Sequence, residues 1–397
     1  MKKGWELKRL PDIAEYFIGL TYSPKDVSDK GIIVLRSSNI QDDTLDLSDL
    51  VRVNRPIKDS LKVRPGDILM CSRNGSKRLV GKTAVIGSLS EEMTFGTFMT
   101  VVRSNFNPYL AWFFKSEMFR QQLGVGENTM INQVTKYMLD AIQLPLPSAS
   151  EQQRIVGLLD EAFEGLATAK ANAEKNLANA RALFESHLQS VFTQRGEGWV
   201  EKNRPLADLC ELIVDCEHKT APIQQEGIPS IRTPNIGKGK LILEGVNRVS
   251  EETYRAWTRR AEPLPGDLIL AREAPAGNVA VIPENTRVCL GQRTVLIRPR
   301  SEIFDPSFLA FLLLEPKTQQ RLLAHSRGAT VQHVNMKDIR ALDVGAIPSL
   351  KVQNSIVSKL LSLDEETQRL QTLYQQKLDA LEALKKSLLH QAFSGNL

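Results

Sequence analysis

Apolar residues recur every three or four positions along two long segments of the chain, 148–194 and 348–397. This spacing places them on one face of an α-helix. A helix of about 40 residues is about 60 Å long and cannot bury such a face by itself. We therefore predict that the two helices pack on each other as an intramolecular coiled coil. The alternative is that each segment is a pair of shorter helices, broken near Gly165 in the first and near Glu366 in the second.

The residues that precede each helical segment follow a different pattern. Short apolar runs alternate there with Gly, Pro, Asn and Asp, which is typical of strands and turns. The clearest runs are 32–35, 67–70, 83–86, 98–102, 267–270, 278–282 and 293–297, and helical patches follow near 109–123 and 307–323. Each half of the chain is thus predicted to begin with a mixed α+β domain.

The two halves are copies of one another. Segments of the first half recur in the same order in the second half: 31–40 as 227–236, 65–69 as 265–269, 81–86 as 277–282, and 107–111 as 305–310. Chance matches would keep neither their order nor their offset, so we interpret the chain as an internal duplication. The duplication divides it into four parts, which are two α+β domains at 1–147 and 195–347 and two helices at 148–194 and 348–397.

Composition narrows the class of protein. The 397 residues are 42% hydrophobic and 24% charged, which excludes global disorder. No apolar run approaches the roughly 18 residues of a membrane span, so we expect neither an integral membrane protein nor a secretory signal. Four cysteines stand far apart at Cys71, Cys210, Cys216 and Cys289, which indicates a reducing cytoplasm and no disulfide framework. The net charge of +5 permits a nucleic-acid partner without requiring one.

Two patterns imitate known sites without matching them. Segment 75–83 is similar to a phosphate-binding loop, but five residues separate its glycines where the motif has four, and a strand-like run follows it. We interpret it as a glycine turn between strands; the alternative is a nucleotide hydrolase that uses 81–83. Cys210, Cys216 and His218 lack the spacing of a zinc site. Because no catalytic motif is present, we predict a recognition subunit without a catalytic site, cofactor or metal.

Further motifs mark the end of each α+β domain and the start of each helix. They lie at 126–133, 142–147 and 151–156 in the first copy and at 328–332, 347–348 and 353–357 in the second, and Arg-x-x-Asn-Ile occurs at 36–40 and 232–236. With these motifs, the whole chain resembles the specificity subunit of a type I restriction–modification system. The second copy departs from that pattern at 351–353 and at Gly345, which we interpret as drift in a structural joint.

This resemblance implies a function for every part of the chain. Each α+β domain would be a target recognition domain that reads one half of an asymmetric bipartite site in double-stranded DNA, and the helices would pack antiparallel and fix the spacing. Two copies of an adenine-N6 methyltransferase subunit would dock on the helices and bring S-adenosylmethionine, and motor-nuclease subunits would bring ATP and Mg²⁺. The chain itself would catalyse nothing, bind no membrane, and act in the cytoplasm of a bacterium or archaeon.

Two sets of loop residues at strand ends offer the chemistry of DNA readout. Base edges are read by hydrogen-bond donors and acceptors, and basic residues hold phosphates. The candidates are Arg36, Asn39, Ser72, Arg73, Asn74, Lys77 and Arg78 in the first copy, and Arg232, Asn235, Arg272, Glu273, Asn278, Gln292 and Arg293 in the second. Lys77 and Arg78 suit phosphates better than bases. The alternative is that the arginines are solvated charges and that Asn39 and Asn235 cap turns.

The sequences around the loops at 71–78 and 271–276 match well between the two copies, but the loops themselves differ most. Two readers of different half-sites are expected to differ in this way. A second hypothesis is a coiled-coil scaffold whose α+β heads bind proteins, because the modest charge and the 6% aromatic content leave room for it.

Overall fold

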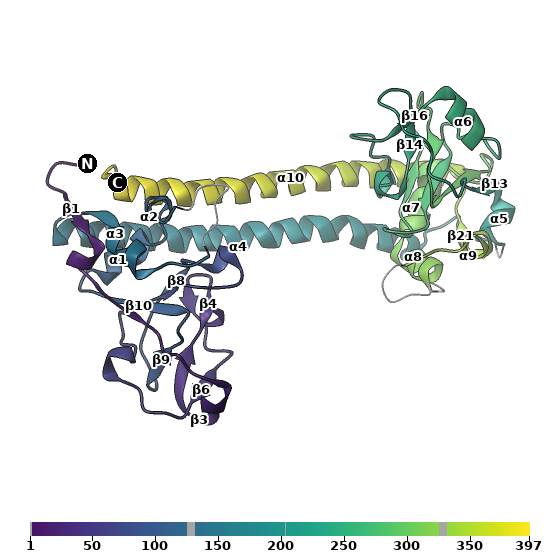
Figure 1. The fold of residues 1–397 in the computed structure, drawn as a ribbon. Helices are drawn as coiled ribbons and strands as arrows, with labels where there is room; N and C mark the ends of the chain where they lie inside the picture. Colours follow the sequence, from purple (N-terminus) through teal and green to yellow (C-terminus); the bar gives the residue numbers. More distant parts are fainter. Residues whose placement is uncertain (1, 125–131, 203, 325–331) are drawn as a thin grey trace. The chain divides into compact units, whose positions relative to one another are not determined.

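A computed structural model describes residues 2–124, 132–202, 204–324 and 332–397 of the chain (Figure 1). Its contacts divide the chain into two compact units. Unit 1 comprises Met1–Glu174 and Gln375–Leu397, and unit 2 comprises Lys175–Tyr374. Each unit therefore contains one α+β domain and a part of each of two long helices.

The two long helices are continuous. Helix α4 spans Ala149–Gln194, with 46 residues, and α10 spans Leu350–Ser394, with 45 residues. Gly165 and Glu366 lie within them without a break, so the alternative of broken helix pairs is wrong. Both helices begin with the same contact, because Gln152 donates a hydrogen bond to the Pro147 carbonyl (2.8 Å) and Gln353 donates one to the Pro348 carbonyl (2.9 Å).

Within unit 1, the first part of α4 packs against the last part of α10. Arg154 Nη2 donates to the carbonyl of Leu397 (2.7 Å), and further along α4 the Phe163 ring lies 5.7 Å from Lys385 Nζ. Residue numbers rise along α4 where they fall along α10, so the helices run antiparallel. Both helices contribute apolar side chains to one core, which are Ile155, Leu159, Leu389, Ala392 and Phe393.

Within unit 2, the last part of α4 and the first part of α10 share another core, to which they contribute Leu188, Phe192, Val357 and Leu360. Two lysines of the α+β domain also bind the helices: Lys238 pairs with Glu185 of α4 (2.6 Å) and Lys240 with Asp364 of α10 (2.8 Å). The packing of the two helices, predicted from their apolar spacing, is thus confirmed in each unit.

The α+β domain of unit 1 is built on two sheets. The strand order is β2 (Glu15–Ile18), β10 (Met99–Arg103), β7 (Ile68–Cys71), β8 (Thr83–Val85) in one sheet and β6 (Val51–Val53), β3 (Val27–Leu35), β9 (Met93–Phe95) in the other. Strand β1 (Glu6–Arg9) pairs with β11 (Gln143–Leu146), and β4 (Ile40–Gln41) with β5 (Thr44–Leu45). The helices are α1 (Asn107–Phe113), α2 (Glu117–Gln122) and α3 (Lys136–Ala141), with short 3-10 turns at Ser37–Asn39 and Lys77–Leu79.

The α+β domain of unit 2 repeats this plan. One sheet has the order β13 (Cys210–Asp215), β20 (Thr294–Pro299), β17 (Leu268–Ala271), β18 (Val279–Val281), β15 (Gly239–Lys240), and another has β16 (Arg248–Val249), β14 (Ile228–Ile231), β19 (Cys289–Leu290). Strand β12 (Val200–Glu201) pairs with β21 (Ala346–Ile347). The helices are α5 (Leu206–Leu209), α6 (Glu251–Trp257), α7 (Pro306–Leu314), α8 (Pro316–Leu323) and α9 (Met336–Ala341).

Strand β7 separates two cores in unit 1. Successive side chains of a strand point to opposite faces, so Ile68 and Met70 join the core shared with the helices, whereas Leu69 joins the core beneath β3. Strand β17 does the same in unit 2, with Leu268 on the helix side and Ile269 on the other. Burial on both faces explains why these strands are uninterrupted apolar runs in the sequence.

The turn before each of these strands is held by a buried ion pair. Gly66 and Gly266 have φ values of +89° and +84°, which a glycine adopts without strain. The aspartate that follows is buried, and Asp67 binds Arg103 through two hydrogen bonds of 2.9 and 2.7 Å. Asp267 binds Arg298 in the same way, so this feature of the repeated segments 65–69 and 265–269 confirms the duplication.

Segment 75–83 forms a turn between antiparallel strands. It contains the 3-10 turn Lys77–Leu79, then Gly81 with a φ of +86°, and it leads into β8, which pairs with β7. Lys82 Nζ donates to the carbonyl of Ile40 (2.6 Å) and thus fixes the turn to the domain. The predicted glycine turn is confirmed. In the described parts of the chain, no helix has the length and apolar character that a membrane crossing requires.

Candidate nucleic-acid interface

The loops that follow β7 and β17 start from the same backbone frame. The N–H of Ser72 donates to the carbonyl of Phe98, and the N–H of Arg272 donates to the carbonyl of Arg293, each at 2.9 Å. Position 72 therefore corresponds to 272, and position 98 to 293. One residue further on, Arg73 corresponds to Glu273, since each makes a β-bridge to the segment before the last short helix of its α+β domain.

In unit 1, the loop presents an arginine and an aromatic ring to the solvent. Arg73 and Phe98 are both exposed, and the Arg73 guanidinium carbon lies 5.5 Å from the centroid of the Phe98 ring. Arg78 is exposed on the following turn. Asn74 is half-buried and bridges to the neighbouring loop, because its Nδ2 donates to Ser37 Oγ (2.7 Å). The structure thus brings the 71–78 loop and the 36–39 turn together.

Two candidates of unit 1 have roles inside the domain. Ser72 is buried, and its Oγ bonds to Thr100 Oγ1 (2.5 Å) on the adjacent strand. Asn39 is fully buried: its Oδ1 accepts from the N–H of Arg36 (2.9 Å), and its Nδ2 donates to the carbonyls of Asp46 and Asp49. Asn39 is enclosed within the domain, and Ser72, although it lines a cleft, is almost fully buried and uses its hydroxyl within the sheet. The alternative that Asn39 caps a turn is confirmed.

Arg36 and Lys77 complete the candidates of unit 1. Arg36 is half-buried and pairs with Asp49 (2.8 Å), while its Nε is buried and has no hydrogen-bond partner among the described residues. The ion pair therefore occupies one nitrogen of its guanidinium. The side chain of Lys77 lies outside what the structure describes, as do residues 126–131 and 328–331 of the sequence motifs.

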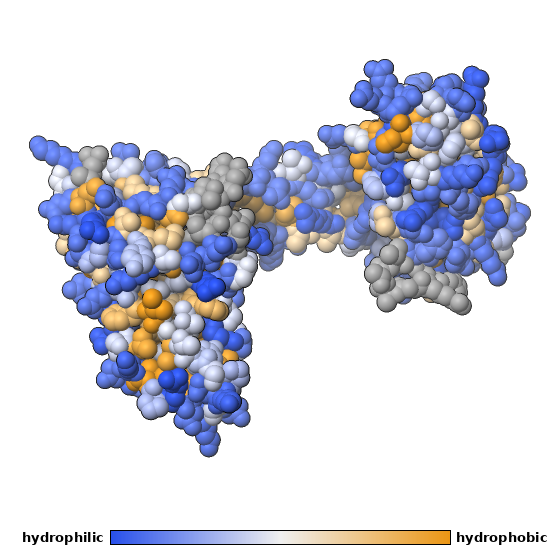
Figure 2. Space-filling model, in the orientation of Figure 1, coloured by the Kyte–Doolittle hydropathy of each residue, from blue (hydrophilic) through white to orange (hydrophobic). Residues whose placement is uncertain are grey.

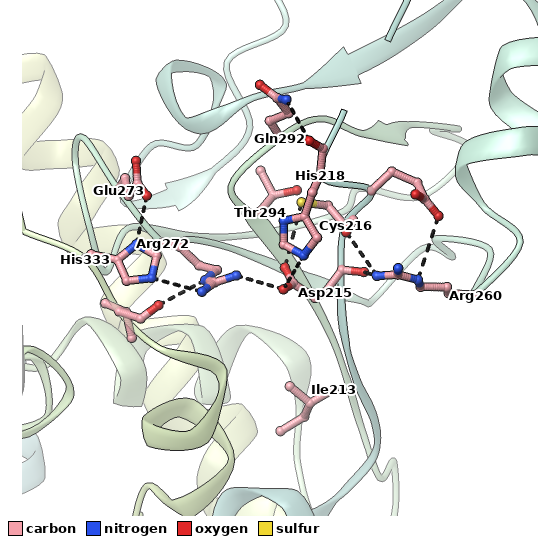
Figure 3. A network of polar contacts seen from close by, with 12 residues as sticks. Ile213, Asp215, Cys216, His218, Arg260, Arg272, Glu273, Gln292, Thr294 and His333 are labelled. Carbon is pink, nitrogen blue, oxygen red and sulfur yellow. Dashed lines mark hydrogen bonds and ion pairs between the residues drawn. The ribbon is translucent and has the colours of Figure 1, made fainter. Parts of the chain in front are cut away.

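In unit 2, Arg272 is the centre of a polar network (Figure 3). Its Nη1 pairs with Asp215 of β13 (2.7 Å), its Nε donates to the carbonyl of Val334 (2.9 Å), and its Nη2 contacts His333 Nε2 (2.9 Å). Only 12% of the side chain is exposed. The network uses every nitrogen of the guanidinium, so Arg272 is bound within the domain, and its contact with a base stays a prediction.

His333 connects Arg272 to the exposed edge of this network. An arginine can only donate hydrogen bonds, so His333 Nε2 accepts the bond from Arg272 and Nδ1 carries the proton. The Nδ1–H then donates to Glu273 Oε1 (2.8 Å), and Glu273 Oε2 pairs with Arg293 Nε (2.9 Å). Arg293 is exposed, so a ligand can reach the Glu273–Arg293 pair.

The remaining candidates of unit 2 divide in the same way. Asn235 accepts a hydrogen bond from the N–H of Arg232 (3.1 Å), in the turn that corresponds to the Asn39 turn of unit 1. The capping alternative is therefore confirmed for Asn235 as well. Asn278 donates to the carbonyl of Ile236 (2.9 Å) and takes the place that Lys82 has in unit 1. The Gln292 side chain donates to the carbonyl of His218 (3.2 Å), and the side chain of Arg232 is exposed.

Sequence reasoning missed three residues that shape these loops. Phe98 was expected to begin the strand at 98–102, but it lies in the turn before β10, which begins at Met99, and its only functional signal is the match to Arg293 in the other copy. Asp215 and His333 are 57 and 61 residues away from Arg272 along the chain, so no local pattern connects them.

The cysteines are buried thiols. All four are free, and burial raises the pKa of Cys210 and Cys289 to about 12 and raises the pKa of Cys71 and Cys216 above its ordinary value. Among the described residues, no group of three or more His, Cys, Asp or Glu side chains is placed to hold a metal ion.

Comparison with protein families gives a match to each half of the chain. The family described as "Type I restriction modification DNA specificity domain" matches residues 2–176 and again residues 197–380. The two matches cover both α+β domains and most of the two long helices.

Individual relatives agree with this match. The chain is 24% identical to the type I restriction enzyme EcoKI specificity subunit of Escherichia coli K12 and 25% identical to the StySPI specificity subunit of Salmonella potsdam, in each case over 100% of this chain and 90% of the relative. Among solved structures, the HsdS subunit from Thermoanaerobacter tengcongensis aligns over 100% of this chain and 98% of its own, with 20% identity and a TM-score of 0.61. A chain from a structural study of complex assembly in a type I R-M system aligns over 100% and 99%, with 20% identity and a TM-score of 0.76.

Proposed function

The chain belongs to the family of type I restriction-modification DNA specificity domains, and from this premise we propose that each of its units reads one half of a bipartite site in double-stranded DNA. The observation that carries the proposal is that the two α+β domains share the same structural contacts but differ in the residues of one loop. The pairs Asp67–Arg103 and Asp267–Arg298, each with a buried aspartate, occur in both copies, whereas Arg73 and Phe98 differ from Glu273 and Arg293 at the equivalent positions. Of these last four side chains, Glu273 is half-buried and the other three are exposed.

The exposed side chains of each unit support different readings. Unit 1 presents Arg73 over Phe98, which suits a guanine edge next to an apolar contact. Unit 2 presents Glu273 paired with Arg293, and a carboxylate can accept a hydrogen bond from the cytosine N4 amine. We assign the exposed Arg78 and Arg232 to phosphate contacts, which would position the domain without reading sequence.

The long helices support a second role as a scaffold. Several leucines on α4 and α10 remain 40% or more exposed and could be covered by a partner: Leu158, Leu183, Leu361, Leu373 and Leu384. We propose that two copies of an adenine-N6 methyltransferase subunit cover this surface and bring S-adenosylmethionine. In a restriction complex, motor-nuclease subunits would add ATP and Mg²⁺. The chain itself acts without a catalytic site, in the cytoplasm.

The proposal is tested by co-expressing the chain with its methyltransferase subunit and mapping N6-methyladenine in the host DNA. The expected result is one split motif with two short defined halves and a fixed gap. If a complex that assembles and binds S-adenosylmethionine adds no methylation, the proposal is wrong and the heads bind another class of partner. High salt provides a second check, because DNA binding by arginines weakens steeply with salt and a protein-binding scaffold need not respond in this way.

A further inference from the structure

Phe98 is an exposed aromatic residue in a rigid position. Its side chain is 53% exposed, although its neighbour Met99 is buried. The Phe98 carbonyl accepts hydrogen bonds from the N–H groups of both Ser72 (2.9 Å) and Arg73 (3.0 Å), so the backbone beneath the ring is tied to the end of β7. The exposed ring above this fixed backbone is thus available for a contact with a ligand.

The ring also orients a basic side chain. Arg73 lies over it at 5.5 Å, within the range of a cation–π interaction, which restricts the directions that the guanidinium can take. The pair therefore presents an apolar surface and a set of hydrogen-bond donors side by side.

Phe98 separates two clefts that are lined by candidate DNA-binding residues. Cleft A, of about 560 Å³, is lined by Ser72, Arg73, Phe98 and the exposed Ile18, among others. Cleft B, of about 680 Å³, is lined by Arg36, Ser37, Ser38, Phe98 and the exposed Val27, among others. Figure 2 shows apolar surface on unit 1 in the region of β9 and β10.

The same position carries opposite chemistry in the other copy. Arg293 replaces Phe98 there, and it forms an ion pair with Glu273 in place of the ring contact with Arg73. A residue with a purely structural role would be of the same type in both copies, as Asp67 and Arg103 are. Position 98 changes together with position 73, as expected for two residues that face the same ligand.

We propose that Phe98 is a specificity-determining residue of unit 1 that recognises the C5 methyl group of a thymine in the major groove, while Arg73 beside it pairs with a neighbouring base. Thymine is distinguished in that groove by its methyl group, and apolar side chains are the ones that contact it. The inference rests on the proposed function, since it names what one residue reads within the half-site of unit 1.

The test uses the complex of the full chain with its methyltransferase subunit and a short duplex that carries the mapped motif. Each thymine of the unit 1 half-site is replaced in turn by uracil, which keeps the base pair and removes only the methyl group. At one position, this replacement should weaken binding by the wild-type complex about four-fold, the value of one buried methyl group. The variants Phe98→Ala and Phe98→Arg should bind the thymine and uracil duplexes equally.

Val85→Ala is the matched control, because Val85 is 45% exposed on β8, where it pairs with Ile68 at the opposite end of β7 from the loop. It should keep the full thymine preference. The proposal is overturned if no uracil substitution weakens wild-type binding, or if Phe98→Ala keeps the thymine preference. The wild-type duplex series does not depend on whether a variant folds. Failure of the proposed function would be different, since no motif would be found and the unmodified duplex would not bind.

Discussion

The loops after β7 and β17 begin at equivalent positions and use their arginines in different ways. In unit 1, Arg73 lies on the surface with its guanidinium over an aromatic ring. In unit 2, Arg272 is withdrawn into the domain, where Asp215, His333 and a backbone carbonyl bind it. An arginine in a loop is therefore exposed to solvent in one copy and a structural link in the other, and the packing of distant strands decides which.

The comparison also teaches where sequence-specific variation is placed. The frame of both domains is held by buried groups that are satisfied within the domain, as Asn39 and Asp67 show. The loop residues above it can change without loss of these contacts. A duplicated domain can thus acquire two reading surfaces while the same pair of helices serves both copies.

The largest effect is expected from the helices, which the two readers share. Removing residues 171–177 from α4 and 371–377 from α10 takes out two turns of each, or about 10 Å. At 3.4 Å per base pair, the spacer of the methylated motif should shorten by about three base pairs, while both halves keep their sequences. Methylation mapping measures this directly. A variant that methylates the motif at its original spacing would contradict the role of the helices as a ruler.

The next effect concerns the contrast between the two arginines. Arg272→Met should lower the free energy of unfolding by about 2–3 kcal/mol, because it leaves the partly buried Asp215 without its cation. Arg73→Met should change the stability by less than about 0.5 kcal/mol, as is usual at exposed positions. Urea denaturation of the full chain compares them.

Mapping the methylated motif tests the same two arginines for DNA recognition instead of stability. Arg73→Met should relax one position of the unit 1 half-site, at a cost of about 1–3 kcal/mol in binding. If instead Arg73→Met destabilises the fold as much as Arg272→Met does, the contrast between the loops is wrong.

A smaller difference is expected between the two capping asparagines. Asn39 is fully buried and its amide makes hydrogen bonds with three backbone groups, whereas Asn235 is half-buried and its amide makes two. Asn39→Ala should therefore lower the stability by about 1–3 kcal/mol, the cost of unsatisfied buried groups, and Asn235→Ala should cost less. Equal losses in thermal denaturation would show that burial does not distinguish the two turns.

The smallest effect is a pH dependence confined to unit 1. Arg154 and Lys2 lower the pKa of Glu151 to about 2 by hydrogen bonds and ion pairing. A carboxyl with a lowered pKa stabilises the fold above its ordinary pKa of 4.5, and this contribution is lost as the pH falls from there toward 2. Glu151→Gln should therefore make the free energy of unfolding fall slightly less steeply with decreasing pH below 4.5. DNA binding at pH 7 should be unchanged. A profile identical to that of the wild type would remove Glu151 from the account.

The sequence predicted those features of the fold that depend on periodicity and repetition. The 3–4 spacing predicted both long helices, and the repeated Pro-Gly-Asp turns predicted the duplicated frame, because each is a local pattern. The site was predicted less well. Residues in the 71–78 and 271–276 loops could be selected as polar, but the burial of Ser72 and the pairing of Arg272 with Asp215 depend on strands that meet only in the folded domain. Phe98 escaped notice because an aromatic residue in a strand-like run normally indicates a core position.

The most direct test of the account is an exchange of one reader. Replacing residues 1–147 by the corresponding domain of a relative with a different target, and mapping N6-methyladenine in cells that also express the methyltransferase subunit, reports both halves of the motif at once. The account predicts that one half changes to that of the relative while the other half and the spacer stay as they were. A change in both halves would contradict the claim that each unit reads DNA independently on a common frame.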